Sequence, residues 1–278
     1  MEGRLHVDGV DLRYTDEGHG DPVLLIHQAG ADSTTWGDVR RHLVLDHRVI
    51  TYDRRGYSGS LFEGAPPLSR HAQDAIALLE HLQAVPTTVA GTSVGATIAL
   101  KIALERPDVV RTMVLHELPF HSKRYLDLGA ARTFMRIARL AKRGEAVEAA
   151  ELFLRWAYRY PEGGTAFDRM PESWREVARR NAIASLNDLQ IATAERTIPT
   201  RLARKTTIPA VCLVGDKSPR PMHAFVRRLT KALPNAVGGT VERSAHAVTF
   251  DQPVAFATKI HAAASAPRPQ AGTARRVR

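Results

Sequence analysis

The chain has 278 residues, 44% of them hydrophobic, and its 39 lysines and arginines outnumber 29 aspartates and glutamates, giving a net charge of +10. This length and apolar content suit one large α/β domain and exclude a chain that is disordered throughout. The sequence has no run of about 18 apolar residues typical of a membrane helix and no groove-reading motif or stacking aromatics typical of nucleic-acid binding.

The first 118 residues alternate between strand-like and helix-like patterns. Apolar or alternating runs predict strands over residues 3–18, 22–28, 47–53, 87–91 and 111–117. Apolar residues at helical spacing predict helices over residues 34–45, 68–84 and directly after residue 93. This alternation is typical of βαβ units, so we expect a mostly parallel sheet with helices on both faces.

The alternation stops near residue 121, and only amphipathic helices are expected from there to residue 205. One of them is expected to carry Ala149, Phe153, Trp156 and Tyr160 as a single stripe. Strands over residues 208–216 and 238–243 and helices over 221–234 and 252–264 follow. The predicted organisation is a core (1–120), a helical insertion (121–205), the rest of the core (206–264) and a disordered basic tail (265–278).

A serine lies between two glycines where the fourth of these apolar segments gives way to a helix, in "AGTSVGATIAL". The pattern G-x-S-x-G on a strand-to-helix turn raises the serine hydroxyl above the sheet, in a turn with no room for side chains at Gly91 and Gly95. A serine nucleophile also needs a base and a group that orients the base. The amide of Val94, at the helix N-terminus, is a candidate donor to an oxyanion.

Further segments fit the same chemistry. "LLIHQAG" supplies a loop in which the amide of Ala29 is a second candidate oxyanion donor, and His246 lies in a loop after the last strand. With "HQAG", "DRRGYSGS", "GTSVG" and "SAHAVTFDQP" in this order, residues 4–263 resemble the α/β-hydrolase fold family. The resemblance implies an eight-stranded, mostly parallel sheet, a helical cap inserted after the sixth strand, Ser93 as nucleophile and His246 as general base. Gln28 departs from the glycine usual there, and its amide is a candidate substrate contact.

Two carboxylates compete for the role of orienting acid. Many relatives place the acid three residues after a glycine that follows the seventh strand, but here Ser218 holds that place and Asp216 lies one residue after the glycine. Glu117 ends the sixth strand in "VLHELPF", and the order Ser, Glu, His is allowed. Fungal zearalenone lactone hydrolases, which the "HELP" segment resembles, take their acid from this strand end. Glu117 is the predicted acid and Asp216 the alternative.

Three other side chains are candidate substrate contacts: His116, Trp156 and Trp174. Each is also compatible with ordinary packing, since aromatic residues at helical spacing commonly pack. No set of residues has metal-ligand spacing and no glycine-rich loop is suited to phosphate, so neither metal nor cofactor is expected. The one cysteine, Cys212, allows no internal disulfide. With no visible secretory signal, a cytoplasmic protein is expected.

These observations favour a serine hydrolase that cleaves a carboxylic ester or lactone of a medium-sized apolar substrate through Ser93, His246 and Glu117. Thioester or carbon–carbon bond hydrolysis and cofactor-free perhydrolysis are alternatives on the same frame. A ligand-binding protein that kept the fold without catalysis is the alternative from another class. The expected partner is the small ester or lactone itself; a homodimer is left open, and neither nucleic acid nor membrane is expected.

Overall fold

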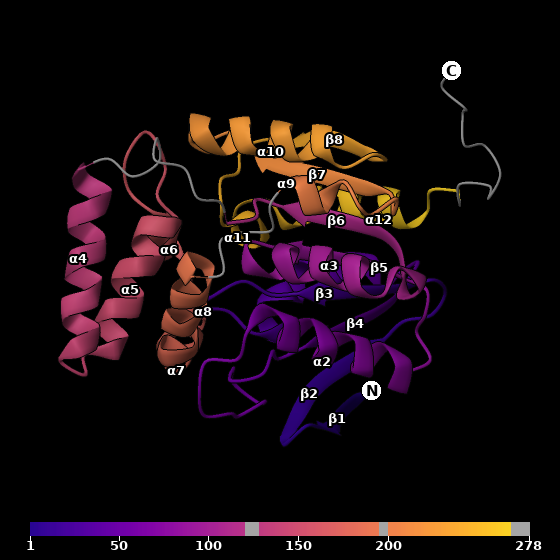
Figure 1. The fold of residues 1–278 in the computed structure, drawn as a ribbon, viewed down its shortest axis with the longest axis horizontal. Coiled ribbons are helices and arrows are strands. Elements are labelled where there is room, and N and C mark those ends of the chain that lie inside the picture. Colours follow the sequence, from indigo (N-terminus) through magenta and orange to yellow (C-terminus); the bar gives the residue numbers. More distant parts are fainter. Residues whose placement is uncertain (120–127, 195–199, 268–278) are drawn as a thin grey trace.

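A single eight-stranded sheet runs through the protein in a computed structural model that describes residues 1–119, 128–194 and 200–267 (Figure 1). The strand order is β1-β2-β4-β3-β5-β6-β7-β8. The strands are β1 (Glu2–Val7), β2 (Val10–Glu17), β3 (Pro22–Ile26), β4 (Arg48–Tyr52), β5 (Thr87–Thr92), β6 (Val110–His116), β7 (Ala210–Gly215) and β8 (Ala236–Val241). Only the pairs β1–β2 and β2–β4 are antiparallel. The predicted α/β class with a mostly parallel sheet is confirmed.

Both faces of the sheet are covered because successive strand residues point to opposite sides. Val23 and Leu25 pack with α1 and α12, whereas Leu24 and Ile26 pack with α2, α3 and α10. The helices of the core are α1 (Gly37–Leu43), α2 (Leu68–His81), α3 (Val94–Glu105), α10 (Arg220–Ala232), α11 (Val248–Asp251) and α12 (Pro253–Ala264), with short 3-10 turns η1 (Ser33–Trp36) and η2 (Pro107–Val109).

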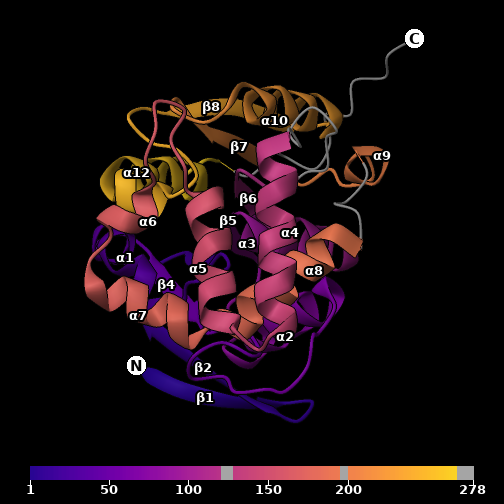
Figure 2. The same cartoon turned by 90° about the vertical axis from the view of Figure 1, so that its left-hand side faces the viewer.

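Helices also fill the described chain between β6 and β7. They are α4 (Leu128–Lys142), α5 (Ala146–Ala157), α6 (Ala166–Arg169), α7 (Glu172–Arg180), α8 (Ala182–Ala194) and α9 (Thr200–Ala203). Figure 1 shows α4 to α8, hereafter the helical insertion, grouped at one end of the sheet, with α8 nearest the core and α4 farthest from it. Figure 2 views the molecule from that side. Ala203 of α9 packs instead in the core cluster that includes α10.

The predicted stripe on α5 is wrong at its last member, Tyr160, which lies beyond the end of the helix. The helix stops at Ala157, with Tyr158 as its C-cap, and the Tyr160 amide donates to the carbonyl of Gly164 in the following turn. Residues 268–278, which make up most of the predicted tail, lie outside the described residues. Residues 121–127 and 195–199 of the predicted insertion lie outside them as well. None of the helices in the described chain has both the length and the hydropathy needed to cross a membrane.

Candidate active site

Ser93 forms a strained turn by itself between β5 and α3. Its backbone dihedrals are φ 52° and ψ −125°, in a region that residues with a Cβ seldom adopt. The flanking glycines allow close packing around this turn. A Cβ on Gly91 would lie 2.4 Å from the carbonyl oxygen of Gly95, and a Cβ on Gly95 would lie 2.2 Å from that of Ile26. The approach of α3 to β5 and β3 therefore requires glycine at both positions.

Glu117 lies directly after β6 and contacts the predicted base. Its Oε2 is 2.8 Å from Nδ1 of His246. Its Oε1 accepts a 2.9 Å hydrogen bond from the amide of Gly215 and another from the hydroxyl of Ser218. The carboxylate is only 1% exposed. Both oxygens are thus engaged, one of them by the imidazole.

The surroundings of Glu117 favour its ionised form. Burial by itself raises the pKa of Glu117, but the neighbouring His116 and the hydrogen bonds from His246 and Ser218 outweigh burial and lower this pKa to about 2. An ionised carboxylate only accepts hydrogen bonds, so Nδ1 of His246 carries the shared proton. Nε2 then keeps a free lone pair, which a general base needs.

The alternative acid, Asp216, lies elsewhere. Its side chain is exposed, and its Oδ1 accepts a 3.0 Å hydrogen bond from the amide of Ser244. The amide of Lys217 donates to the carbonyl of Ser244 at 3.0 Å. Asp216 therefore fastens the loop that carries His246, and among the described contacts it makes none with the imidazole itself.

The predicted nucleophile, acid and base follow three parallel strands of one sheet. Ser93 follows β5, Glu117 follows β6 and His246 follows β8, so all three lie at the carboxyl edge. The Ser93 amide donates to the carbonyl of His116 at 2.9 Å, and the ring centroids of His116 and His246 are 6.4 Å apart. Within the described chain the Ser93 hydroxyl forms no hydrogen bond, to His246 or otherwise. Free enzymes commonly form this bond only in the substrate complex.

Two backbone amides near Ser93 are unengaged. Val94 is the first residue of α3, where the first amides of a helix lack intrahelical partners and the helix dipole favours negative charge. Ala29 belongs to the loop after β3, and the described residues provide no acceptor for its amide or for that of Val94. Both amides are therefore available to an external oxyanion.

His27 and Gln28 brace this loop from within. Nδ1 of His27 donates to the Gln28 carbonyl at 2.8 Å while its Nε2 accepts from the amide of Arg54 at 3.0 Å, so the ring is neutral. Burial, followed by the charge of Arg54, lowers the pKa of His27 well below its usual value. The Gln28 side-chain oxygen accepts a 2.5 Å hydrogen bond from the hydroxyl of Thr92. The glutamine that departs from the usual glycine is thus anchored to β5.

The three predicted aromatic contacts are all packed. His116 is fully buried, and the centroid of its ring lies 6.4 Å from that of His246 and 5.6 Å from that of Phe256. Trp156 packs edge-on against Phe134, with the two ring centroids 4.7 Å apart. Trp174 packs edge-on against Phe250, with the two ring centroids 6.0 Å apart. Substrate contact by Trp156 or Trp174 stays a prediction.

Sequence reasoning missed two neighbours of Glu117, namely Ser218 and Gly215. The spacing of the "GDKSP" segment drew attention to position 218, but only for the lack of a carboxylate there. A hydroxyl in that place can still donate to a carboxylate brought from the next strand. The sequence therefore contained a signal, the serine at position 218. Its role as a donor to Glu117 could be recognised only once the ends of β6 and β7 were known to be in contact.

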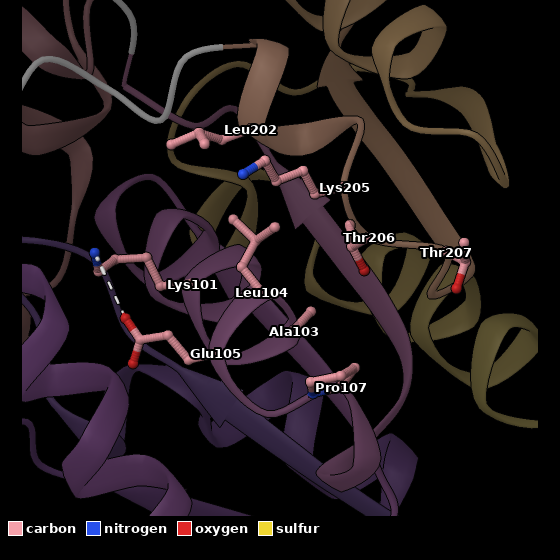
Figure 3. Close-up of a pocket in the computed structure, with 9 residues that line it drawn as sticks. All are labelled: Lys101, Ala103, Leu104, Glu105, Pro107, Leu202, Lys205, Thr206 and Thr207. Atoms are coloured by element: carbon pink, nitrogen blue, oxygen red, sulfur yellow. Dashed lines mark ion pairs between the residues drawn. The ribbon is translucent and has the colours of Figure 1, made fainter.

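A surface pocket of about 390 Å³ lies at the opposite end of α3 from Ser93 (Figure 3). Leu104 and Pro107 line it together with Leu202 and Lys205, and Lys101 pairs with Glu105 at 3.7 Å. No histidine, cysteine or serine lines it, so it is separate from the site at Ser93. Across residues 1–119, 128–194 and 200–267, no three His, Cys, Asp or Glu side chains are grouped to hold a metal ion.

Comparisons with known proteins find similarity to hydrolases. The profile of the "Alpha/beta hydrolase family" matches residues 23–259. The uncharacterized hydrolase YraK of Bacillus subtilis is 37% identical over 119 residues, which are 41% of this chain and 44% of YraK. The chain thus spans less than half the length of this curated relative in the match.

Solved structures resemble the chain over almost its whole length. Est816, described as an N-acyl homoserine lactone degrading enzyme, superposes with a TM-score of 0.74 at 18% identity, over 93% of this chain and 98% of that one. A thermophilic esterase from Thermogutta terrifontis superposes with a TM-score of 0.73 at 22% identity, over 94% and 97%. At such identities the likeness concerns the fold alone.

Proposed function

The chain belongs to the alpha/beta hydrolase family, and from this premise we propose that it is a serine hydrolase that cleaves carboxylic esters or lactones. The observation that carries the proposal is the 2.8 Å contact between Oε2 of Glu117 and Nδ1 of His246. It lies at the same sheet edge as Ser93, a serine on a strained strand-to-helix turn. A nucleophile, a base and an orienting acid are the three groups that acyl transfer through serine requires.

The proposed reaction proceeds through an acyl-enzyme. Nε2 of His246 removes the proton of the Ser93 hydroxyl as its oxygen attacks the substrate carbonyl. The oxyanion accepts hydrogen bonds from the Ala29 and Val94 amides, and donors of this kind contribute about 3–4 kcal/mol each to lowering the barrier. The tetrahedral intermediate collapses, the carbon–oxygen bond breaks, and His246 returns its proton to the leaving alcohol. Water activated by the same imidazole then releases the acid, while Glu117 stabilises the imidazolium.

The proposed substrate is a medium-sized apolar ester or lactone. In this proposal the helical insertion acts as a cap over the sheet edge, and its aromatic residues, among them Trp156 and Trp174, favour an apolar acyl or aryl group. The "HELP" segment around Glu117 resembles that of zearalenone lactone hydrolases, and Est816 is described as acting on a lactone. The first likeness favours a lactone among the candidate esters, whereas the second is a likeness of fold.

A fluorophosphonate probe tests the proposal directly, because it labels serines that are activated as nucleophiles. Wild type should be labelled, Ser93→Ala should not, and Ser265→Ala, which removes an exposed serine at the end of α12, should be labelled like wild type. A panel of p-nitrophenyl esters, simple lactones and resorcylic macrolactones, with Ser93→Ala as blank, then defines the substrate. Fresh wild type that resists labelling would favour the ligand-binding alternative.

A further inference from the structure

Side chains of the helical insertion hold three consecutive residues of the loop after β3. The contacts are Tyr158 hydroxyl to Ala29 carbonyl at 3.1 Å, Gly30 amide to Ser185 hydroxyl at 2.9 Å, and Asn181 side-chain amide to Ala31 carbonyl at 3.1 Å. Each link joins a backbone group of the loop to a buried side chain. The segment 29–31 lies outside every helix and strand, so these links replace the hydrogen bonds of regular structure.

Packing restricts the same segment further. Gly30 has φ +70°, and a Cβ there would lie 2.6 Å from the side chain of Leu154 on α5. Because the Gly30 amide is engaged by Ser185, the adjacent amide of Ala29 is the one left for an oxyanion. The insertion therefore fixes the peptide units directly after the Ala29 amide, while His27 and Thr92 of the core fix Gln28 directly before it.

Asn181, directly before α8, and two residues of α8 itself form a buried polar stripe that faces the core. Asn181, Ser185 and Asp188 have spacings of four and three residues, which places them on one face of a helix. A polar face is normally turned to solvent, yet all three side chains are buried against loops of the core. Burying polar groups is unfavourable unless they are hydrogen-bonded, and each of these three is. The stripe thus serves specific contacts with the core loops.

A second route connects the stripe to the same loop. Asp188 accepts 2.5 Å hydrogen bonds from the guanidinium of Arg54 and from the hydroxyl of Tyr57. The backbone amide of Arg54 donates to His27, whose ring in turn donates to the Gln28 carbonyl. The loop is therefore fastened directly to Ser185 of α8 through residue 30 and to Asn181, directly before α8, through residue 31, and indirectly to α8 through the loop after β4.

From these contacts we propose that Tyr158, Asn181 and Ser185 are positioning residues for the oxyanion hole, so that the insertion is part of the catalytic apparatus as well as a cover. The proposal rests on the proposed function, since it assigns the Ala29 amide to an oxyanion. Stabilisation of a developing charge depends on donors that are fixed before the reaction begins. Loss of a link to the loop should therefore weaken binding of the transition state while leaving binding of the ground state nearly unchanged.

The test compares Tyr158→Phe and Ser185→Ala with Tyr52→Phe. The first two each remove one link to the loop, and Tyr158→Phe keeps the ring that lies beside His246. Tyr52→Phe removes a buried hydroxyl that has no hydrogen-bond partner in the described chain. With a p-nitrophenyl ester, we expect kcat to fall about tenfold in each link variant with KM within about twofold, and no change in the control.

A trifluoromethyl ketone provides the readout that a purely structural role would not move, since its adduct with serine places an oxyanion in the hole. Its affinity should fall in parallel with kcat/KM in the link variants. Unchanged kcat and ketone affinity, with only a lower Tm, would overturn the proposal. Wild type that neither reacts with a fluorophosphonate nor hydrolyses the ester would overturn the proposed function, and this one with it. The two failures are thus distinguishable.

Discussion

The hydroxyl of Ser218 donates a hydrogen bond to Oε1 of Glu117. Ser218 stands three residues after Gly215, at the place where many alpha/beta hydrolases carry the triad acid. In this chain the carboxylate that contacts His246 comes from the end of the neighbouring strand β6, and Ser218 donates to that carboxylate. A charge-assisted hydrogen bond of this kind is stronger than a neutral one and fixes the orientation of the carboxylate.

Glu117→Gln should abolish most of the activity. The amide can still occupy the site, but it lacks the charge that stabilises the imidazolium and does not enforce the required tautomer. Loss of the orienting acid in a serine triad lowers kcat by about 10⁴-fold. Asp216→Asn is the matched control, because the new side chain keeps the oxygen that accepts from the Ser244 amide. Ester hydrolysis by the two variants decides between the acids: a large loss in Asp216→Asn alone would contradict the assignment.

Ser218→Ala should reduce kcat with little effect on KM. The substitution removes one hydrogen bond to a buried carboxylate, and such bonds contribute about 1.5–3 kcal/mol, or roughly 10- to 160-fold in rate if the contribution is expressed in the transition state. Ser218→Thr retains a hydroxyl and should recover part of the loss. Steady-state kinetics of both variants measure this. Equal activity of Ser218→Ala and wild type would show that the hydrogen bond does not position Glu117.

Gly215→Ala should displace the loop that carries His246. A Cβ at position 215 would lie 2.3 Å from the carbonyl oxygen of Ser244, and the backbone has to move to relieve the contact. A shift of about 1 Å at a catalytic group lowers the rate by about 100-fold. We expect such a loss in kcat together with a lower Tm.

Gly238→Ala on β8 is the control for this substitution, since its nearest contact, with Thr230, would be an ordinary 3.5 Å. Its Tm should stay the same or rise slightly, because alanine loses less conformational entropy than glycine on folding. Activity of Gly215→Ala equal to that of Gly238→Ala would mean that the His246 loop tolerates the extra carbon.

Most of the fold was accessible from the sequence because the apolar patterns were local. Runs such as "PVLLI" and "RVITY" alternate between the two covered faces of the sheet and end at turn residues, so these strands were predicted within a few residues. The single strand predicted over residues 3–18 was wrong, because this segment folds into the antiparallel pair β1 and β2. Ser93 and His246 stood out for the same reason, since the elbow and the final loop are short contiguous motifs. The end of α5 was mispredicted because the backbone leaves the helix after Ala157 and the Tyr160 amide donates to the Gly164 carbonyl, a turn that the spacing of apolar residues does not encode.

The supporting contacts were inaccessible because they depend on how distant segments meet. Asn181 and Ser185 look like solvent-facing residues in a helical pattern, and only the packing of α8 on the core loops makes them buried hydrogen-bonding groups. The role of Ser218 likewise requires the ends of β6 and β7 to be neighbours in the sheet. A polar stripe embedded in an otherwise apolar helix such as "NAIASLNDLQIA" is the signal that would have justified attention.

His116 should make the protein sensitive to mild acid. Its ring is fully buried, and neither nitrogen has a hydrogen-bond partner among the described residues. Burial lowers its pKa to about 4, although the nearby Glu117 opposes the shift. Unfolding restores a pKa of about 6.5, so between these values the unfolded chain binds a proton that the folded chain excludes. Stability from this source is complete above about pH 6.5 and falls as the pH drops towards 4.

His116→Met removes this contribution and makes the prediction measurable. From pH 7.5 to pH 5, wild type should lose about 2 kcal/mol more of its free energy of unfolding than the variant, as urea titrations at the two pH values would report. Glu117 does not interfere, because its lowered pKa makes its own contribution disappear only as the pH falls from about 4.5 towards 2. At pH 7.5 the variant should be as stable as wild type or more so, since no hydrogen bond is lost. Parallel stability curves for the two proteins across this range would mean that His116 gains its proton without unfolding.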